Sequence, residues 1–309
     1  VTIDGGTTAL IIAASTIDGD LTLTSGNASG ITDSGTVTVG GNLSATTDAN
    51  AGVITLNQMA VDGSFTLAPN GSGAVTIVND AALTLAASTM GGTFSGTATT
   101  GDITDSGTLT ITGAATFKTA ATGSNIVLDG SSNAYSAAVT MIADAGGEAF
   151  GNITFVDSAA IDFATSASSN GDLYINAATD GAVGGNLSVT ATTGNITDTV
   201  ALAVSGTTTL VTSADNATIA LDTTTNAFTG ALTITTNDSS GTDADVTIDG
   251  GTTALIIAAS TIDGDLTLTS GNSSGITDSG TVTVGGNLSA TTDANAGVIN
   301  LGTMAVDGT

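Results

Sequence analysis

The chain has 309 residues, with 28 acidic side chains against a single basic one, Lys118, and a net charge of −27 at neutral pH. This balance excludes nucleic acid as a partner, since phosphate contacts need several lysines or arginines, and it argues against docking on anionic lipid. Cysteine and histidine are absent, which excludes disulfides, thiolate or imidazole metal sites, and Ser-His-Asp or Cys-His catalysis.

Hydrophobic residues make up 40% of the chain and aromatic residues only 3%, so the apolar content is mainly Ala, Val, Leu and Ile. Valine, isoleucine and threonine favour strands, and their abundance predicts a folded, strand-rich chain. No apolar run is long enough for a transmembrane helix, so we expect no membrane insertion in this segment.

The expected elements are strands of three to five residues in which Leu, Val, Ile or Phe alternates with Thr or Ser. Most of them follow a glycine and recur at intervals typical of solenoid repeats. In chain order these segments are 19–23, 41–45, 63–67, 92–96, 151–155, 171–175, 185–189, 206–210 and 230–234. A second motif, built on Ile-Thr-Asp, lies between some of them at 30–39, 101–111 and 194–204.

The strand period predicts the fold. Leu21 and Leu23 should face a core while Thr22 and Thr24 face solvent, because side chains alternate across a strand. Two or three such strands fit a coil of about 20–24 residues, whereas a propeller blade needs about 40–45 residues and helical repeats need a 3.6-residue period. We therefore predict an all-β, right-handed parallel β-helix, a β-solenoid that forms an elongated rod.

Turn signals support this fold. Asp-Gly pairs mark the expected corners, at residues 4–5, 18–19, 62–63 and 129–130. Asp-Gly is also a strong hairpin signal, so hairpin insertions in the longer coils stay open at this point.

A longer repeat encloses the coils. Residues 246–309 repeat residues 1–64 with five differences, at an offset of 245 residues. The differing pairs are Ala28/Ser273, Thr55/Asn300, Asn57/Gly302, Gln58/Thr303 and Ser64/Thr309. We therefore interpret residues 1–245 as one full super-repeat of about 11 coils and residues 246–309 as the start of the next. Both would belong to one continuous solenoid, and we expect these 309 residues to be a fragment of a longer chain.

Four phrases carry a resemblance to known proteins: GNLSVTATTGNITD (185–198), SGTLTITGAATF (106–117), SNAYSAAVTM (132–141) and TNAFTGALTI (225–234). They resemble the repeats of filamentous-haemagglutinin-like proteins and related giant exported bacterial adhesins. The resemblance implies a right-handed β-helix on the surface of a bacterial cell, or released as fibres, often for attachment. It transfers no functional residue to this chain.

The sequence predicts no catalytic, cofactor-binding or metal-binding residues. Carbohydrate-active enzymes also use parallel β-helices, but a single lysine cannot supply both the cation and the base of a lyase. Glycosidases need two carboxylates at a set separation, and sugar-stacking aromatics are scarce here. Tyr135 and Tyr174, the only tyrosines, are interpreted as packing residues. We therefore expect no enzyme.

Calcium is the remaining candidate ligand, since it prefers oxygen donors. The densest acidic stretch runs from Asn237 and Asp238 to Asp243, Asp245 and Asp249, and close pairs occur at Asp18/Asp20 and Asp263/Asp265. Neither a calcium-binding nonapeptide repeat nor an EF-hand loop is present. Turn-forming or solvated aspartates are therefore the preferred interpretation, and diffuse divalent bridging between neighbouring rods stays open.

These observations predict a structural protein whose tandem coils form a secreted, extracellular or cell-surface bacterial fibre. Its partners would be further copies of itself, in fibres or bundles, and a cell surface or extracellular matrix. The alternatives are the stalk of an adhesin whose binding tip lies elsewhere and, less favoured, a carbohydrate-active β-helix. Lys118 is the only tryptic site in the block, which suits survival outside a cell.

Overall fold

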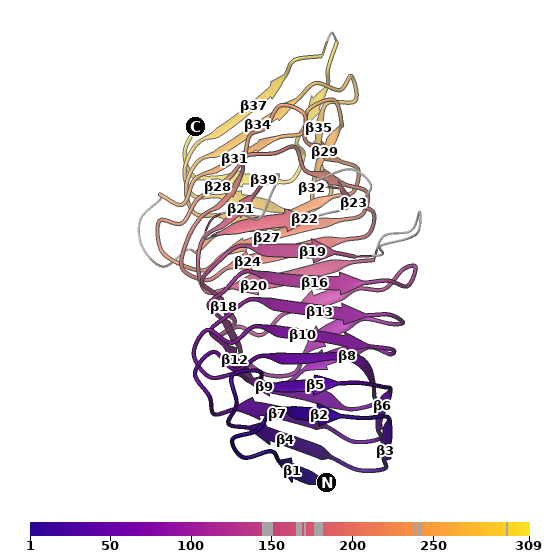
Figure 1. Cartoon of the computed structure of the whole chain (residues 1–309). Coiled ribbons are helices and arrows are strands. Elements are labelled where there is room, and N and C mark those ends of the chain that lie inside the picture. Colours follow the sequence, from indigo (N-terminus) through magenta and orange to yellow (C-terminus); the bar gives the residue numbers. More distant parts are fainter. Residues whose placement is uncertain are drawn as a thin grey trace. The chain divides into compact units, whose positions relative to one another are not determined.

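The computed structural model describes residues 1–143, 151–164, 169, 171–175, 182–237, 239, 243–294 and 296–309. Across these ranges the chain forms 39 short strands and no helix, and therefore no helix that is long and apolar enough to cross a membrane (Figure 1). Two compact units make up the chain: Val1–Gly151 with Ala167–Gly171, and Asn152–Ser166 with Asp172–Thr309. The strands of each unit pair in parallel as stacked coils of a β-solenoid, which confirms the predicted fold class.

Alternating burial explains why these segments are strands. In β4 (Leu21–Ser25) the Leu21 and Leu23 side chains are fully buried, whereas Thr22 and Thr24 are half-buried on the outer surface. The same pattern recurs in most of the other five-residue strands, such as β24 (Leu187–Ala191). Each coil thus buries its Leu, Ile, Val and Phe side chains between two sheets, which the hydrophobic effect favours.

In unit 1 each coil has one long strand on one face and two short strands, joined by a bend, on the other. The long strands of the first coils form the first face: β1 (Thr2–Asp4), β4, β7 (Leu43–Thr47) and β9 (Ser64–Ala68). The short strands form the second face: β2 (Leu10–Ile12) with β3 (Ser15–Ile17), β5 (Ile31–Asp33) with β6 (Val37–Val39), and β8 (Ile54–Val61), in which both short strands are fused.

The two faces of unit 1 exchange roles after β9. The next long strands lie on the second face: β10 (Val75–Asn79), β13 (Phe94–Ala98), β16 (Ala115–Thr119) and β19 (Val139–Ile142). The short strands now lie on the first face: β11 (Leu83–Leu85) with β12 (Ser88–Met90), β14 (Ile103–Asp105) with β15 (Leu109–Ile111), and β17 (Ile126–Leu128) with β18 (Ala134–Tyr135).

Strand register gives the coil lengths in unit 1. The shortest coil places Val75 beside Phe94, and one of the longest places Ala115 beside Val139. The other registers lie between these limits, as in the pair Leu21 and Leu43. The coil lengths in the structure are therefore close to the predicted one.

Unit 2 has the same construction, and its faces are named separately. The long strands of its first face are β20 (Ile153–Asp157), β24, β27 (Thr208–Thr212) and β30 (Leu232–Thr235). The short strands of its second face are β21 (Ile161–Phe163) with β23 (Ala182–Val183), β25 (Ile196–Asp198) with β26 (Ala203–Val204), and β28 (Ile219–Leu221) with β29 (Ala227–Phe228). The additional strand β22 (Asp172–Ile175) pairs in parallel with β21. It makes this coil, in which Ile153 pairs with Leu187, longer than any coil of unit 1.

The faces of unit 2 also exchange roles once, after β30. Long strands then lie on the second face: β31 (Val246–Asp249), β34 (Leu266–Ser270) and β37 (Leu288–Thr292). Short strands lie on the first face: β32 (Leu255–Ile257) with β33 (Ser260–Ile262), β35 (Ile276–Asp278) with β36 (Val282–Val284), and β38 (Ile299–Asn300) with β39 (Met304–Val306). The long strand β30 pairs with both β32 and β33, so two consecutive short strands lie alongside one long strand in the same sheet.

Each time the chain crosses a face it adds one position, which is either a long strand or a pair of short strands. The exchange defines a repeat of seven such positions, in which long strands and short pairs alternate and the first and last positions are long strands. Two faces make one coil, so seven positions amount to three and a half coils. Two long positions then follow each other along the chain, at β9–β10 in unit 1 and at β30–β31 in unit 2. Each new repeat therefore starts half a turn from the previous one, which the sequence analysis did not predict.

Aromatic side chains fill the core of unit 1 in adjacent coils. The rings of Phe94 and Phe117 have centroids 5.2 Å apart at an angle of 49°, and the Phe117 and Tyr135 rings meet edge to face at 6.2 Å. All three side chains are at most 2% exposed. Such pairs add about 0.5–1.5 kcal/mol to the burial of their apolar area.

Candidate functional site

The two tyrosines lie in different surroundings, and the structure does not bring them together at one site. Tyr135 belongs to the core of unit 1, and its ring contacts Phe117. Tyr174 lies on β22 of unit 2 and is half-buried, between the buried Leu173 and Ile175. The packing role predicted for Tyr135 agrees with this placement.

The Asp18/Asp20 pair is exposed, and Asp20 begins a ladder of hydrogen bonds between coils. The Asp20 carboxylate accepts hydrogen bonds from the Asn42 N–H at 2.8 Å and from Asn42 Nδ2 at 3.3 Å. One coil further on, Asn42 Oδ1 accepts the Ser64 N–H at 2.9 Å and the Ser64 hydroxyl at 3.0 Å. In this series the polar residue before one long strand thus holds the start of the next.

The same ladder recurs in unit 2, in the second copy of the sequence. Asp245 Oδ1 accepts the Asp265 N–H at 2.8 Å, and Asp265 Oδ1 accepts the Asn287 N–H at 2.6 Å. Asn287 Oδ1 then accepts the Thr309 N–H at 3.0 Å. Asp245 and Asn287 are exposed and Asp265 is half-buried, and each of the three bonds to the backbone of the next coil. We call both series the coil ladder.

The remaining members of the acidic stretch separate in the structure. Asp249 accepts the N–H of Gly251 within its own turn, and Asn237 Nδ2 donates to the carbonyl of Ser213. Asp263 is 5% exposed and accepts the Asp243 N–H at 3.3 Å. Asp238 lies outside the described residues. Where the structure describes the chain, no three carboxylates are gathered in a way that could hold a metal ion.

A second kind of polar contact, which the sequence analysis did not single out, closes the bend between two short strands. The Asp105 carboxylate accepts the N–H groups of Asp129 (2.9 Å) and Gly130 (3.0 Å). It also accepts Asn133 Nδ2 at 2.8 Å, while Asn133 Oδ1 accepts the Leu109 N–H at 2.9 Å. Asn133 is fully buried, so these bonds satisfy polar groups that water does not reach.

Unit 2 contains the same contact between Asp198 and Asn226. Asn226 Nδ2 donates to Asp198 at 2.7 Å, and Asn226 Oδ1 accepts the Leu202 N–H at 2.7 Å. We call these two contacts the Asp–Asn latches. Their signal in the sequence is an Ile-Thr-Asp triplet followed, more than 20 residues later, by Asn-Ala-aromatic, and it lies within the motifs described above.

Burial raises the pKa of Asp198, although hydrogen bonds from Asn226 and from the N–H groups of Asp222 and Thr223 oppose the shift. A carboxyl whose folded-state pKa is raised contributes stability that is fully present below its unfolded pKa and is lost as the pH rises through the folded pKa. We therefore expect Asp198→Asn, which cannot ionise, to show a shallower fall in unfolding free energy from pH 4 to pH 7. Urea unfolding at a series of pH values measures this slope, and identical slopes would contradict the prediction.

Lys118 lies in β16, where its register partners are Thr97 and Ile142 on the neighbouring strands. A protease must bind the chain around its cleavage site as a free extended segment. Strand β16 is not free, because it is hydrogen-bonded to β13 on one side and to β19 on the other. We expect trypsin to leave the native chain intact and to cut it after unfolding in urea, giving residues 1–118 and 119–309. Gel electrophoresis of the digest measures the cleavage. Rapid cleavage of the native chain at Lys118 would show that this coil opens easily and would contradict the prediction.

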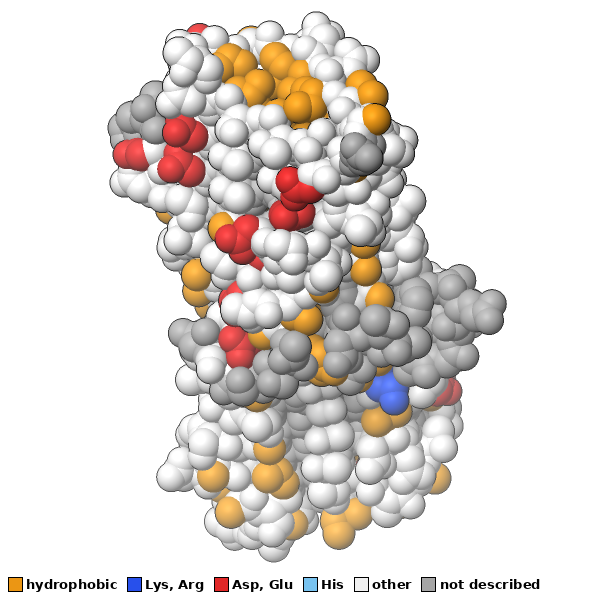
Figure 2. All heavy atoms as spheres, turned by 90° about the horizontal axis from the view of Figure 1, so that it is seen from above, with side chains coloured by type: hydrophobic (Ala, Val, Ile, Leu, Met, Phe, Trp, Pro, Cys, Tyr) orange, Lys and Arg blue, Asp and Glu red, His pale blue; other side chains and the backbone are white. Residues whose placement is uncertain are grey.

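Acidic side chains lie in small, separate groups on the face seen in Figure 2, between larger areas of backbone and neutral polar side chains. The net charge of −27 is thus spread over many positions. This distribution fits a solvated coat more closely than a concentrated binding site.

Comparison with known proteins adds one match. Neither the curated proteins nor the solved structures that were searched contain a match to this chain. A family model described as "Repeats of unknown function (DUF5649)" matches residues 1–68, 72–142, 150–235 and 243–308. The first three segments end with β9, β19 and β30, so their limits coincide with the ends of the seven-position repeats. Since the matches cover most of its length, the chain belongs to this repeat family.

Proposed function

We propose that this segment is a structural shaft, a length of solenoid that gives an extracellular or cell-surface fibre its extent and stiffness. The coil ladder is the observation that carries the proposal. Its polar side chains bond from coil to coil, as in the series Asp20, Asn42 and Ser64, and so reinforce the stack. Side chains used in this way join the coils and are not arranged around a substrate.

In a continuous array the seven-position repeat sets the geometry of the shaft. A 245-residue block contains three family segments of seven positions, which gives 21 positions, or 10.5 coils. This is half a coil fewer than the 11 estimated from the sequence. With a rise of about 4.8 Å per coil, 10.5 coils stacked on one axis would extend a shaft by roughly 50 Å.

The acidic coat and the single tryptic site suit a location outside a bacterial cell, which the resemblance to exported adhesins also implies. We infer no enzymatic activity and no required cofactor, because histidine and cysteine are absent and only one lysine is present. Further copies of the same chain are the proposed partners.

Electron cryo-microscopy of the native full-length protein tests the shaft. We expect straight filaments with an axial repeat of about 4.8 Å and contacts between segments of this kind, either lateral or end to end. If the segment is instead the stalk of an adhesin, the same axial repeat will occur in isolated filaments that carry a separate tip. Separate globules joined by flexible linkers would overturn the proposal.

A further inference from the structure

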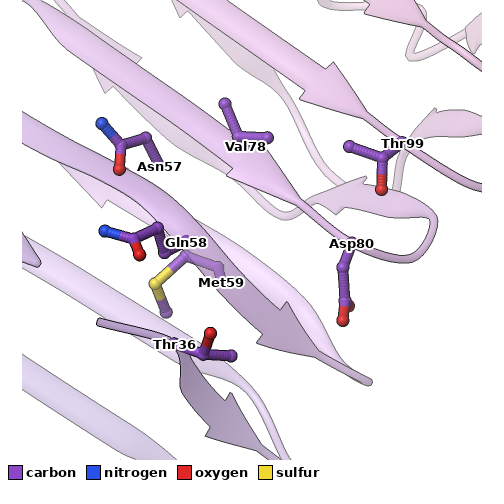
Figure 3. Close-up of a pocket in the computed structure, with 7 residues that line it drawn as sticks. All are labelled: Thr36, Asn57, Gln58, Met59, Val78, Asp80 and Thr99. Carbon is purple, nitrogen blue, oxygen red and sulfur yellow. The ribbon is translucent and has the colours of Figure 1, made fainter. Parts of the chain in front are cut away.

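A groove of about 220 Å³ lies on the outer surface of unit 1, where the fused strand β8 meets β10 and the long strands change face (Figure 3). Its lining includes the amide side chains of Asn57 and Gln58, the Asp80 carboxylate, and the apolar groups of Met59 and Val78. The groove therefore combines neutral hydrogen-bonding groups with a small apolar surface.

A β-bulge in β8 turns both amides outward. Leu56 pairs with Ile77 and Met59 pairs with Asn79, so two residues on β8 oppose the single residue Val78 on β10. Burial along β8 shows the same irregularity, because Asn57 and Gln58 are both exposed while Leu56 and Met59 are buried. Bulges redirect side chains in this way and are frequent next to functional sites.

The two amides differ from most asparagines of this chain in their hydrogen bonding. Asn42, Asn133 and Asn226 all use their side chains to hold the next coil or bend. The Asn57 and Gln58 side chains make no such bond within the described residues, and Figure 3 shows them one beside the other at the groove. Gln58 is also the only glutamine in the sequence.

The second copy of the sequence lacks both amides. Gly302 and Thr303 stand at the equivalent positions, and the Gly302 N–H and the Thr303 hydroxyl donate to Asp278 and to the Gly280 carbonyl. In the first copy the Gln58 N–H donates in the same way to Asp33 at 2.6 Å, so the backbone of both copies is tied to the preceding coil. The amides are thus not needed to build this coil, and two of the five differences between the copies fall on them.

We propose that this groove binds a neutral hexose unit of a glycan. Adjacent amides present donors and acceptors that match vicinal hydroxyls, each of which both donates and accepts, while the half-buried Val78 offers a small apolar surface to the ring carbons. The groove volume of about 220 Å³ is smaller than that of sites for drug-sized ligands, which is about 300–1,000 Å³, and so suits a single sugar ring. Asp80 and the net charge of −27 disfavour acidic sugars.

Selective ¹⁵N labelling of glutamine makes Gln58 the only side-chain amide that is visible by NMR, so its signals report directly on the groove. We expect a saturable shift of this resonance with methyl glucoside, methyl galactoside or methyl mannoside, with a Kd on the order of 1 mM, and a much smaller shift with galacturonate. No shift with any of the three glycosides at 50-fold higher concentration would overturn the proposal. An equal response to galacturonate would overturn the assignment to neutral sugars.

Two variants provide the matched controls. The double change Asn57→Gly and Gln58→Thr installs the residues of the second copy, and Gln58→Ala removes one amide. Both should resist trypsin at Lys118 as the native chain does, while saturation transfer to the bound glycoside falls at least tenfold in the double variant. Undiminished saturation transfer in a folded double variant would place binding elsewhere and so contradict the inference.

Discussion

Gly30→Ala is expected to unfold the coil in which it lies, with a loss of more than about 4 kcal/mol of local stability. Gly30 has a φ of +66°, and a Cβ atom there would stand 1.7 Å from the carbonyl oxygen of Val53 in the next coil. That oxygen accepts the Ile31 N–H at 2.9 Å, so moving it away breaks the ladder between the two coils. Hydrogen exchange of the flanking strands measures the effect.

Gly6→Ala is the control for this prediction. Gly6 has a similar φ of +57°, but a Cβ atom there would meet nothing within 4 Å. This variant should therefore show only the cost of the left-handed backbone, about 1–2 kcal/mol. Equal protection of the Gly30 and Gly6 variants would mean that the close approach to Val53 is absent.

Asn79→Ala is expected to cost about 3–5 kcal/mol, because it leaves several buried polar groups without partners. Asn79 is fully buried at the point where the faces of unit 1 exchange roles. Its Oδ1 accepts the Val61 N–H at 2.9 Å, and its Nδ2 donates to the carbonyls of Val61 (3.0 Å) and Ala82 (2.7 Å). Val61 pairs with Val39 of β6 on one side, and the Asn79 side chain completes its hydrogen bonding on the other side, where the register between β8 and β10 has ended.

Asn27→Ala is the matched control, since the Asn27 amide is accessible to water and donates to the Thr7 carbonyl at 2.9 Å. Water can replace this bond, so the loss should stay below about 1 kcal/mol. Trypsin cleavage at Lys118 in increasing urea compares the two variants, since cleavage follows unfolding of the neighbouring coils. Similar urea midpoints would contradict the role given to Asn79.

Much of the fold follows from the sequence because strand period and glycine spacing are local signals. Each of the nine segments predicted to begin with a glycine contains a strand, from β4 at residues 21–25 to β30 at residues 232–235. Inward and outward positions follow from the same alternation. The Ile-Thr-Asp motif also predicts the same element each time, since it forms the first of two short strands at β5, β14 and β25.

The exchange of faces could not be predicted in the same way. The motif of a long strand is the same on either face, so β7 and β13 look alike in sequence although they lie on opposite faces of unit 1. Only the pairing of coils that are distant in sequence distinguishes them. The signal that was present is the pair of consecutive long strands, at residues 64–68 and 75–79, with no Ile-Thr-Asp motif between them.

The groove and the latches were missed for a related reason. Asparagine is common in turns, so the buried roles of Asn79, Asn133 and Asn226 are hidden among exposed turn residues of the same type. The bulge at Asn57 and Gln58 depends on the register between β8 and β10, and register is a property of the pair of strands. The difference between the two sequence copies at these positions was the available clue.

Disulfide cross-linking tests the half-turn change between repeats most directly, since the chain has no cysteine of its own. Thr55 on β8 and Thr76 on β10 are register partners with outward side chains, and the usual strand spacing of about 4.8 Å lies within the Cα separation that a disulfide spans. If the long strands instead all stayed on the first face, β10 would lie beside β9 and Thr76 beside Thr66. We predict that the Thr55→Cys/Thr76→Cys variant forms its disulfide in the folded chain and that Thr66→Cys/Thr76→Cys does not, and the opposite result would contradict this architecture.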